Sequence, residues 1–269
     1  MKMKISCIPG LLLLIVGTFI SCRKDDNAPV TPDPQPGLFE KVLGKWEMNN
    51  ASTRKIIHNV ASAKNQRPPS FVSIEFLSDT TYILVLENGN VIDGDFSLED
   101  TTVISLDGLG LLTDITFADE SLSFNISTSD WGKLSVSANK AEAIPDNPNT
   151  RLICRTWILD SVATGNIIYG IGYPEEYRVL VRFSETGTYY LKRYALGLTE
   201  NAPDTLQLAQ TMRWTWDIEK PGTFLYEFEG EYKKAVINEL KSGSLKFEAE
   251  GFRGDQLVPD ARFVFVPAE

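Results

Sequence analysis

Few side chains in this sequence could carry out covalent or metal chemistry. The chain contains one histidine, His58, and three cysteines, Cys7, Cys22 and Cys154. One histidine cannot form the clusters of histidine and cysteine ligands that are typical of zinc sites, so we expect no metal and no cofactor. As a nucleophile, Cys154 would need a nearby base, yet His58 lies in a different half of the chain. We therefore interpret Cys154 as a small buried residue on a strand.

Carboxylates are more numerous, and two of them placed about 5 to 9.5 Å apart can hydrolyse a glycosidic bond. Candidate pairs occur in Glu175-Glu176, Asp93-Gly94-Asp95 and Glu227-x-Glu229. Acids two residues apart on a strand point to the same face, and here that face carries the polar residues. The pattern therefore predicts solvated surface acids. We expect a protein that is not an enzyme, with a glycan hydrolase as a distant alternative.

The N-terminus has the features of a secretory signal peptide. Lys2 and Lys4 give it a positive start, and a mostly apolar run extends from Ile8 to Ile20. A helix of these 13 residues would rise only ~20 Å, which is shorter than the ~30 Å hydrocarbon core of a bilayer. We therefore predict that residues 1–21 are a cleaved signal peptide rather than a membrane-spanning helix.

The residues around Cys22 indicate a lipid modification. Phe19-Ile20-Ser21-Cys22 resembles the lipobox of bacterial lipoproteins, although a phenylalanine opens it where leucine is usual. The resemblance implies cleavage before Cys22 and a lipid on this cysteine that anchors the chain in a membrane. The following Lys24, Asp25 and Asp26 resemble the acidic export signal of Bacteroidota-type lipoproteins. This second resemblance implies the outer face of the outer membrane, with a periplasm-facing location as the alternative.

Residues 22–37 are predicted to form a stalk. The segment from Asn27 to Gly37 contains four prolines in eleven residues, a composition that favours an extended, semi-rigid chain. Removing residues 1–21 deletes two lysines and no acid, so the formal net charge changes from -10 to -12. A chain this acidic is not expected to bind nucleic acid or anionic lipid through its charge.

Residues 38–269 contain an internal repeat. Three segments of the first half are echoed, in the same order, in the second half. The pairs are residues 44–46 with 155–157, 75–83 with 182–190, and 115–127 with 237–249. Matching landmarks in one order indicate a tandem duplication. We therefore predict two domains, at 38–144 and 151–269, joined by a turn-rich linker at 145–150.

Short runs of alternating apolar and polar residues occur throughout both halves. In the second half, for example, Trp214 and Trp216 alternate with Arg213 and Thr215. A period of two predicts antiparallel strands with one buried face, and turn sequences rich in glycine and proline separate the runs. Helical turns are expected only just before the first tryptophan of each half, at 38–43 and around 149–153. The sequence therefore predicts an all-β fold.

A short helix followed by Gly-x-Trp and a meander of strands resembles the start of the lipocalin-like domains of bacterial lipoproteins. The motif is Leu43-Gly44-Lys45-Trp46 in the first half and Arg155-Thr156-Trp157, without the glycine, in the second. The resemblance covers nearly all of the mature chain. It implies two tandem small antiparallel meander β-barrels, each preceded by a short helical turn. It also implies that Trp46 and Trp157 pack across the bottom of their barrels and that an open end can hold an apolar ligand.

The interior of such a barrel offers little free space. A barrel of about eight strands has room for its own side chains or for one small ligand. Each large aromatic side chain buries about 150 to 250 Å², so the second half favours a packed core. A ligand cup lined by the same residues is the alternative. The candidate interior positions are Phe183, Tyr189, Trp214, Trp216, Tyr226 and Phe247.

Three further features could take part in recognition. Residues 82–86 are apolar on both faces of the expected strand, so the other repeat, a loop or a partner protein should cover the outer face. The loop 165–177 places Tyr169 and Tyr173 among glycines, which suits either recognition or a plug for the end of the barrel. The insertion 195–210 could form a lid or cover a sheet edge.

Together these patterns predict a membrane-anchored, surface-exposed lipoprotein that acts as a non-enzymatic binding or interaction module. Its ligand would be a small apolar molecule or an envelope protein. The alternative is a structural accessory subunit of a cell-envelope complex, whose solid barrels would bind through their outer faces. An apolar cavity on the order of a few hundred cubic ångströms in either barrel would favour the ligand-binding interpretation.

Overall fold

The computed structural model describes residues 37–49, 54–55, 69–145, 148–164, 177–197, 202–253 and 256–268. Residues Pro36–Glu269 form one compact unit. No helix in the described ranges is long and apolar enough to cross a membrane. The predictions that lie outside the described residues are those for the signal peptide, the stalk, Cys22, Lys24, Asp25, Asp26, Tyr169 and Tyr173.

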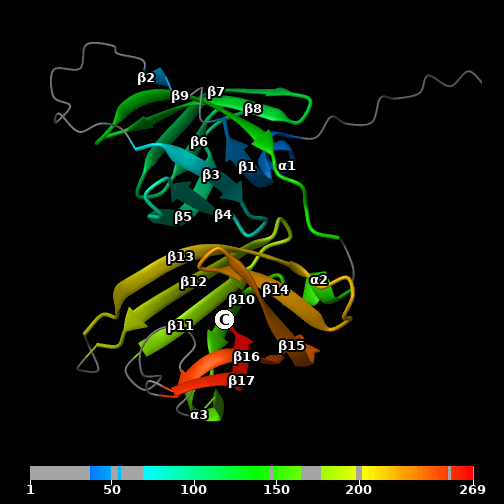
Figure 1. Ribbon diagram of the computed structural model, residues 1–269. Coiled ribbons are helices and arrows are strands. Elements are labelled where there is room, and N and C mark those ends of the chain that lie inside the picture. Colours follow the sequence, from blue (N-terminus) through cyan, green and yellow to red (C-terminus); the bar gives the residue numbers. More distant parts are fainter. Residues whose placement is uncertain are drawn as a thin grey trace, which may run out of the picture. The chain divides into compact units, whose positions relative to one another are not determined.

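The unit contains two closed antiparallel barrels in tandem, which confirms the predicted fold class (Figure 1). The strands of the first barrel are β1 (Gly44–Met48), β2 (Arg54–Lys55), β3 (Phe71–Phe76), β4 (Thr81–Leu86), β5 (Val91–Leu98), β6 (Ile104–Leu106), β7 (Gly110–Ala118), β8 (Ser121–Thr128) and β9 (Gly132–Lys140). They pair in the order β1-β3-β4-β5-β6-β7-β8-β9, and β1 also pairs with β9 to close the barrel. The short β2 pairs with β9.

The second barrel is a meander that closes through β10 and β17. Its strands are β10 (Thr156–Leu159), β11 (Tyr177–Phe183), β12 (Thr188–Ala195), β13 (Thr205–Trp216), β14 (Thr223–Phe228), β15 (Glu231–Lys241), β16 (Ser244–Arg253) and β17 (Gln256–Pro267). Helix α1 (Leu38–Val42) precedes β1 and α2 (Pro148–Ile153) precedes β10, as predicted. A third helix, α3 (Ser161–Thr164), follows β10, where the sequence predicts none. Of the predicted insertion 195–210, residues 205–210 belong to β13 and pair with β12.

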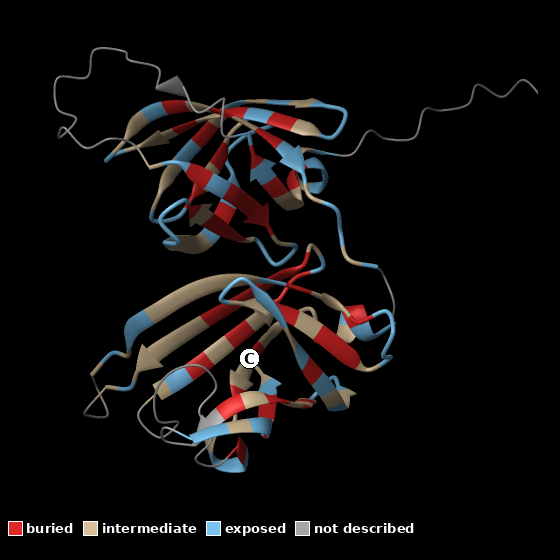
Figure 2. Ribbon diagram, in the orientation of Figure 1, coloured by how far each residue is buried: buried red, intermediate tan, exposed pale blue. Residues whose placement is uncertain are grey.

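The alternating sequence pattern accounts for the strands. In β9, Leu134, Val136 and Ala138 are buried, and the residues between them are less so. Figure 2 shows buried segments alternating with more exposed ones along strands of both barrels. The hairpin between β4 and β5 turns at Gly89, whose φ of 81° is a left-handed conformation that glycine adopts at little cost.

Each barrel begins with a tryptophan that is tied to the helix before it. Nε1 of Trp46 donates a hydrogen bond to the carbonyl oxygen of Val42 over 2.7 Å, and Nε1 of Trp157 donates to that of Ile153 over 2.9 Å. Both indole side chains belong to the hydrophobic core of their barrel. The bond satisfies a carbonyl group near the end of the helix and fixes that short helix against the first strand. Both repeats use the same device at equivalent positions.

The interiors of the two barrels differ in composition. The first barrel has a largely aliphatic core, whereas the second has a core dominated by aromatic rings. The fully or almost fully buried aliphatic residues of the first core include Ile74, Leu84, Ile104, Leu106, Leu112, Leu122, Ile126, Leu134 and Val136. The same strand topology therefore accommodates two different core compositions.

Candidate functional site

The predicted interior positions of the second barrel contact one another. The ring of Phe183 lies at the centre, with its centroid 4.8 Å from that of Tyr189, 5.2 Å from that of Trp214 and 5.3 Å from that of Phe224. Phe247 lies 5.3 Å from Phe224. All five side chains are at most 2% exposed. Close ring packing of this kind favours a packed core over a ligand cup.

Two more of the predicted positions lie at the edge of this aromatic cluster. The ring of Tyr226 is 6.1 Å from that of Phe224 and is almost fully buried. Trp216 is only partly buried; its ring lies 5.4 Å from that of Trp214, and its Nε1 donates to Oγ1 of Thr150 over 2.9 Å. Trp216 therefore ties α2, which contains Thr150, to the wall of the barrel.

The second barrel covers the outer face of β4. Tyr82 and Leu84 belong to the core of the first barrel, whereas Ile83 between them points outward. Ile83 is nevertheless only 3% exposed, and it lines a small cavity together with Leu180 and Tyr190 of the second barrel. Of the three covers that the apolar pattern allowed, the structure selects the other repeat.

The same hairpin of each repeat takes part in this contact. In the alignment of the repeats, Glu75 corresponds to Arg182, and Asp79 corresponds to Thr186. Nη2 of Arg182 forms an ion pair with Oδ2 of Asp79 over 2.7 Å, and the hydroxyl group of Thr186 donates to Oε1 of Glu75. Each contact therefore joins the same two positions of the repeat, with the roles of the first and second repeat exchanged. This is the pattern of an isologous dimer interface.

A third polar contact between the barrels involves Asp93. The hydroxyl group of Tyr190 donates to Oδ1 of Asp93 over 2.8 Å, and the Lys192 ammonium pairs with Oδ2. Burial, together with the negative charge of Asp93, raises the pKa of Tyr190, so the phenol stays protonated and can donate. Asp93 lies on the outer face, as the sequence pattern predicts, but the second barrel covers it in part, so that its side chain is 26% exposed.

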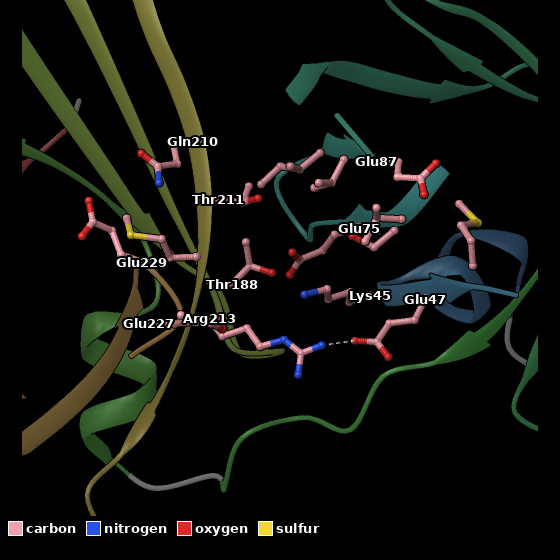
Figure 3. Close-up of a pocket in the computed structure, with 17 residues that line it drawn as sticks. Lys45, Glu47, Glu75, Glu87, Thr188, Gln210, Thr211, Arg213, Glu227 and Glu229 are labelled. Carbon is pink, nitrogen blue, oxygen red and sulfur yellow. Dashed lines mark hydrogen bonds and ion pairs between the residues drawn. The ribbon is translucent and has the colours of Figure 1, made fainter. Parts of the chain in front are cut away.

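A polar cleft of about 500 Å³ lies at this contact between the barrels (Figure 3). Its walls come from β1, β3 and β4 of the first barrel and from β12, β13 and the β14–β15 turn of the second. An ion pair between Glu47 and Arg213, with nearest atoms 3.4 Å apart, bridges the two barrels at the cleft. The charged lining residues are Lys45, Glu47, Glu75, Glu87, Arg213, Glu227 and Glu229. Carboxylates therefore outnumber cations around the cleft.

Two buried polar atoms in the cleft wall have no hydrogen-bond partner within the described part of the chain. They are Oε2 of Glu75, a residue that is 2% exposed, and Oγ1 of Thr188, a residue that is 3% exposed. Buried polar groups in native proteins are nearly always paired, because an unpaired group loses its hydration without compensation. The pair of orphan atoms therefore marks the cleft as the candidate functional site.

Sequence reasoning did not find Glu75. In the strand pattern of β3 it occupies an outward position, where a glutamate is ordinary. The usable signal was on the neighbouring strand, because Ile83, the residue paired with Glu75, is an apolar residue on an outward position. A covered outer face at Ile83 implies that the adjacent Glu75 is covered too.

Cys154 lies between the barrels, in the bend between α2 and β10, and it is half-buried, so the prediction of a buried residue on a strand was wrong. It lines a cavity with Glu75, Arg182 and Glu185. Burial raises the pKa of the Cys154 thiol, and the charges of Glu185 and Glu75 raise it further. Since the thiolate is the nucleophile, the protonated thiol is suited to packing rather than to covalent chemistry.

Neither a search for metal-binding groups nor a comparison with known proteins assigns a function. Among the described residues, no group of three or more histidine, cysteine, aspartate or glutamate side chains could hold a metal ion. A scan against protein-family models found no match, and a search of curated proteins found no similar sequence. The candidate site therefore rests on the geometry and charge of the cleft.

Proposed function

We propose that this protein is a lipid-anchored, non-enzymatic interaction module that binds through the outer surface of a rigid pair of barrels. The observation that carries the proposal is that the aromatic interior of the second barrel is packed against itself while the two barrels lock together side by side. A partner or ligand is then bound by the outer surface of the barrels, and above all by the cleft between the repeats. The sequence around Cys22 supports the anchor, and Lys24, Asp25 and Asp26 support display on the outer face of the outer membrane.

The side-chain hydrogen bonds between the barrels support this proposal. Arg182, Thr186 and Tyr190 of the second barrel each bond to a side chain of the first. Such bonds restrain the two barrels against each other, and a restrained surface loses less conformational entropy on binding, so more of the interaction energy appears as affinity. The contact therefore pre-organises the cleft and the surface around it.

The anchor is tested by Cys22→Ser, which removes the sulfur that would carry the lipid. We expect the unaltered protein in the membrane fraction and Cys22→Ser in the soluble fraction. Cys154→Ser is the matched control, because it also removes one thiol and should stay with the membrane. Protease treatment of intact cells should degrade the anchored protein, whereas protection from the protease would contradict display at the cell surface.

The binding role is tested by isolating the tagged, full-length protein from membranes under native conditions and identifying what accompanies it by mass spectrometry. A partner recovered in a sub-stoichiometric, exchangeable amount supports an interaction module. A fixed stoichiometric set of envelope proteins supports the alternative of a structural accessory subunit, which packed barrels suit equally well. Recovery of a small apolar molecule from the interior would contradict the proposal.

A further inference from the structure

One half of the pseudo-symmetric contact between the repeats is incomplete. On the complete side, Nη1 of Arg182 lies 3.0 Å from Oγ1 of Thr81. In the alignment of the repeats, Arg182 corresponds to Glu75 and Thr81 corresponds to Thr188. The symmetry-related contact would therefore join Glu75 and Thr188. Glu75 makes the counterpart of the Arg182–Asp79 contact, because it accepts a hydrogen bond from Thr186. The glutamate is shorter than the arginine, and it does not make the counterpart of the Arg182–Thr81 contact. The two unpaired atoms of the cleft, Oε2 of Glu75 and Oγ1 of Thr188, are therefore the atoms that would form this symmetry-related contact if the side chain of Glu75 were longer.

Both orphan atoms belong to side chains that face the cleft. Figure 3 shows the Glu75 carboxylate and the Thr188 side chain directed toward one another in the middle of the cleft. A carboxylate oxygen accepts hydrogen bonds, so the partner that Oε2 of Glu75 lacks is a donor. A donor that carries positive charge would compensate the buried carboxylate best.

The rest of the lining indicates the shape of such a donor. Val85 and Met212 give the walls an apolar portion, and Glu87 and Glu229 place exposed carboxylates at the rim. An aliphatic stem matches the apolar portion, and positive charge at both ends matches the buried and the rim carboxylates. The volume of about 500 Å³ falls within the range of small-molecule sites.

We propose that the cleft binds an aliphatic diamine or polyamine. Both orphan atoms have almost no accessible surface, so a small rotation of the Glu75 and Thr188 side chains toward the cleft accompanies binding. One ammonium group then donates to Oε2 of Glu75 and to Oγ1 of Thr188, the methylene chain lies along Val85 and Met212, and a further ammonium group meets the rim carboxylates. This inference deepens the proposed function, on which it rests, because it names a ligand class for the interaction module.

Lys45 is a built-in competitor for this site. It lines the cleft, and within the described residues its ammonium group forms no ion pair. A bound ammonium and the Lys45 ammonium repel each other, and both are attracted to Glu75. Removing the charge of Lys45 should therefore strengthen diamine binding, whereas a purely structural role for Lys45 would leave binding unchanged or weaken it.

The test is calorimetric titration of cadaverine into the purified full-length protein at fixed ionic strength. We expect saturable binding at one site, weaker binding of n-pentylamine, and no binding of the neutral 1-pentanol. Glu75→Gln should weaken cadaverine binding by about tenfold or more, which corresponds to the loss of a charge-assisted hydrogen bond. Thr188→Val should weaken binding less, and Lys45→Gln should strengthen it.

Glu120→Gln is the matched control, because it removes one exposed carboxylate in the β7–β8 turn, away from the cleft. It should bind cadaverine like the unaltered protein. An equal loss of binding in Glu120→Gln and Glu75→Gln would mean diffuse attraction to an acidic protein and would overturn the proposal. The absence of saturable binding in both the unaltered protein and Lys45→Gln would overturn it as well.

If Glu75→Gln does not fold, the Thr188→Val variant decides, since it changes no charge. Failure of diamine binding would leave the anchor and the capture of a partner standing, because those are measured in cells and membranes.

Discussion

The two barrels share one plan and differ in what they put inside and outside it. Inside, the first barrel packs mostly aliphatic side chains, while the second packs a continuous network of rings around Phe183. Both begin with a buried tryptophan bonded to the preceding helix. The fold therefore depends on the alternation of strands and on this bond, and it tolerates a wide choice of core residues.

Outside, the two barrels have become complementary. At the contact, the first barrel supplies the carboxylates of Asp79, Asp93 and Glu75, and the second supplies the donors. Equivalent positions carry opposite partners, as Glu75 and Arg182 show. The outward positions of the two similar repeats differ in a way that lets the barrels fit together, and the counterpart of the Arg182–Thr81 bond is missing because the Glu75 side chain is too short.

The largest expected effect comes from truncating the ring at the centre of the second core. Phe183→Ala should lower the free energy of unfolding by roughly 3 to 5 kcal/mol, because it removes a buried ring and leaves a cavity. Phe76→Ala is the matched variant in the first barrel. Phe76 is equally buried, but among the described residues its ring packs against one other ring, that of Phe96 at 5.2 Å. We expect the smaller loss for Phe76→Ala, measured by urea denaturation. An equal or larger loss would show that ring packing adds nothing to the second core.

The next effect tests where the barrels are alike. Trp46→Phe and Trp157→Phe each keep a large ring but remove the Nε1 donor, so the carbonyl oxygen of Val42 or Ile153 loses its partner. Each substitution should cost about 1 to 3 kcal/mol, the penalty for an unpaired buried acceptor. The two losses should agree, as measured by the same denaturation. If only one of the two substitutions lowered the free energy of unfolding, the hydrogen bond would be present in both barrels but would stabilise only one of them.

The sequence predicts the interior of each barrel better than the contact between them. Alternation along a strand reports burial locally, which is why Trp214, Phe247 and the paired tryptophans fall where the pattern places them. The burial of Glu75 depends on a distant segment, and no local pattern encodes it. The outward Ile83 indicated that something covers this face, but an apolar residue does not specify its cover. The register that brings Thr186 to Glu75 follows from the pseudo-symmetry, which becomes visible only when the barrels are seen together.

A smaller effect compares two arginines at the contact. The side chain of Arg182 is 19% exposed and pairs with Asp79, whereas that of Arg213 is 64% exposed and pairs with Glu47. Arg182→Ala should lower the free energy of unfolding by about 1 kcal/mol and Arg213→Ala by close to zero, because solvent screens the more exposed pair. Thermal denaturation of both variants checks the difference. If Arg213→Ala were the more damaging, the centre of the contact would lie at the cleft rim and not at Arg182.

The smallest effect is the pH dependence of the Asp79 ion pair. Burial alone would raise the pKa of Asp79, but hydrogen bonds from Thr81 and the charge of Arg182 outweigh it and hold this pKa below its ordinary value of 3.8. A carboxyl group whose pKa is lowered by folding stabilises the folded state above its unfolded pKa. That contribution is lost as the pH falls through the lowered value, because the folded protein then binds the proton as well.

Asp79→Asn isolates this contribution. The side chain of Asp79 is 51% exposed, so the unaltered protein should exceed Asp79→Asn in stability by less than ~1 kcal/mol at pH 7. The difference should stay constant down to about pH 5 and then shrink as the pH approaches and falls below 3.8, since the protonated aspartate resembles the asparagine in charge. Other carboxyl groups titrate over the same range in both proteins and cancel in the difference. Denaturation measured at a series of pH values in the Arg182→Ala background should show a smaller difference above about pH 5 and the same small difference at the lowest pH values. A difference that persisted unchanged in that background would mean that Thr81 alone holds the pKa down and that Asp79 stabilises the first barrel and not its contact with the second.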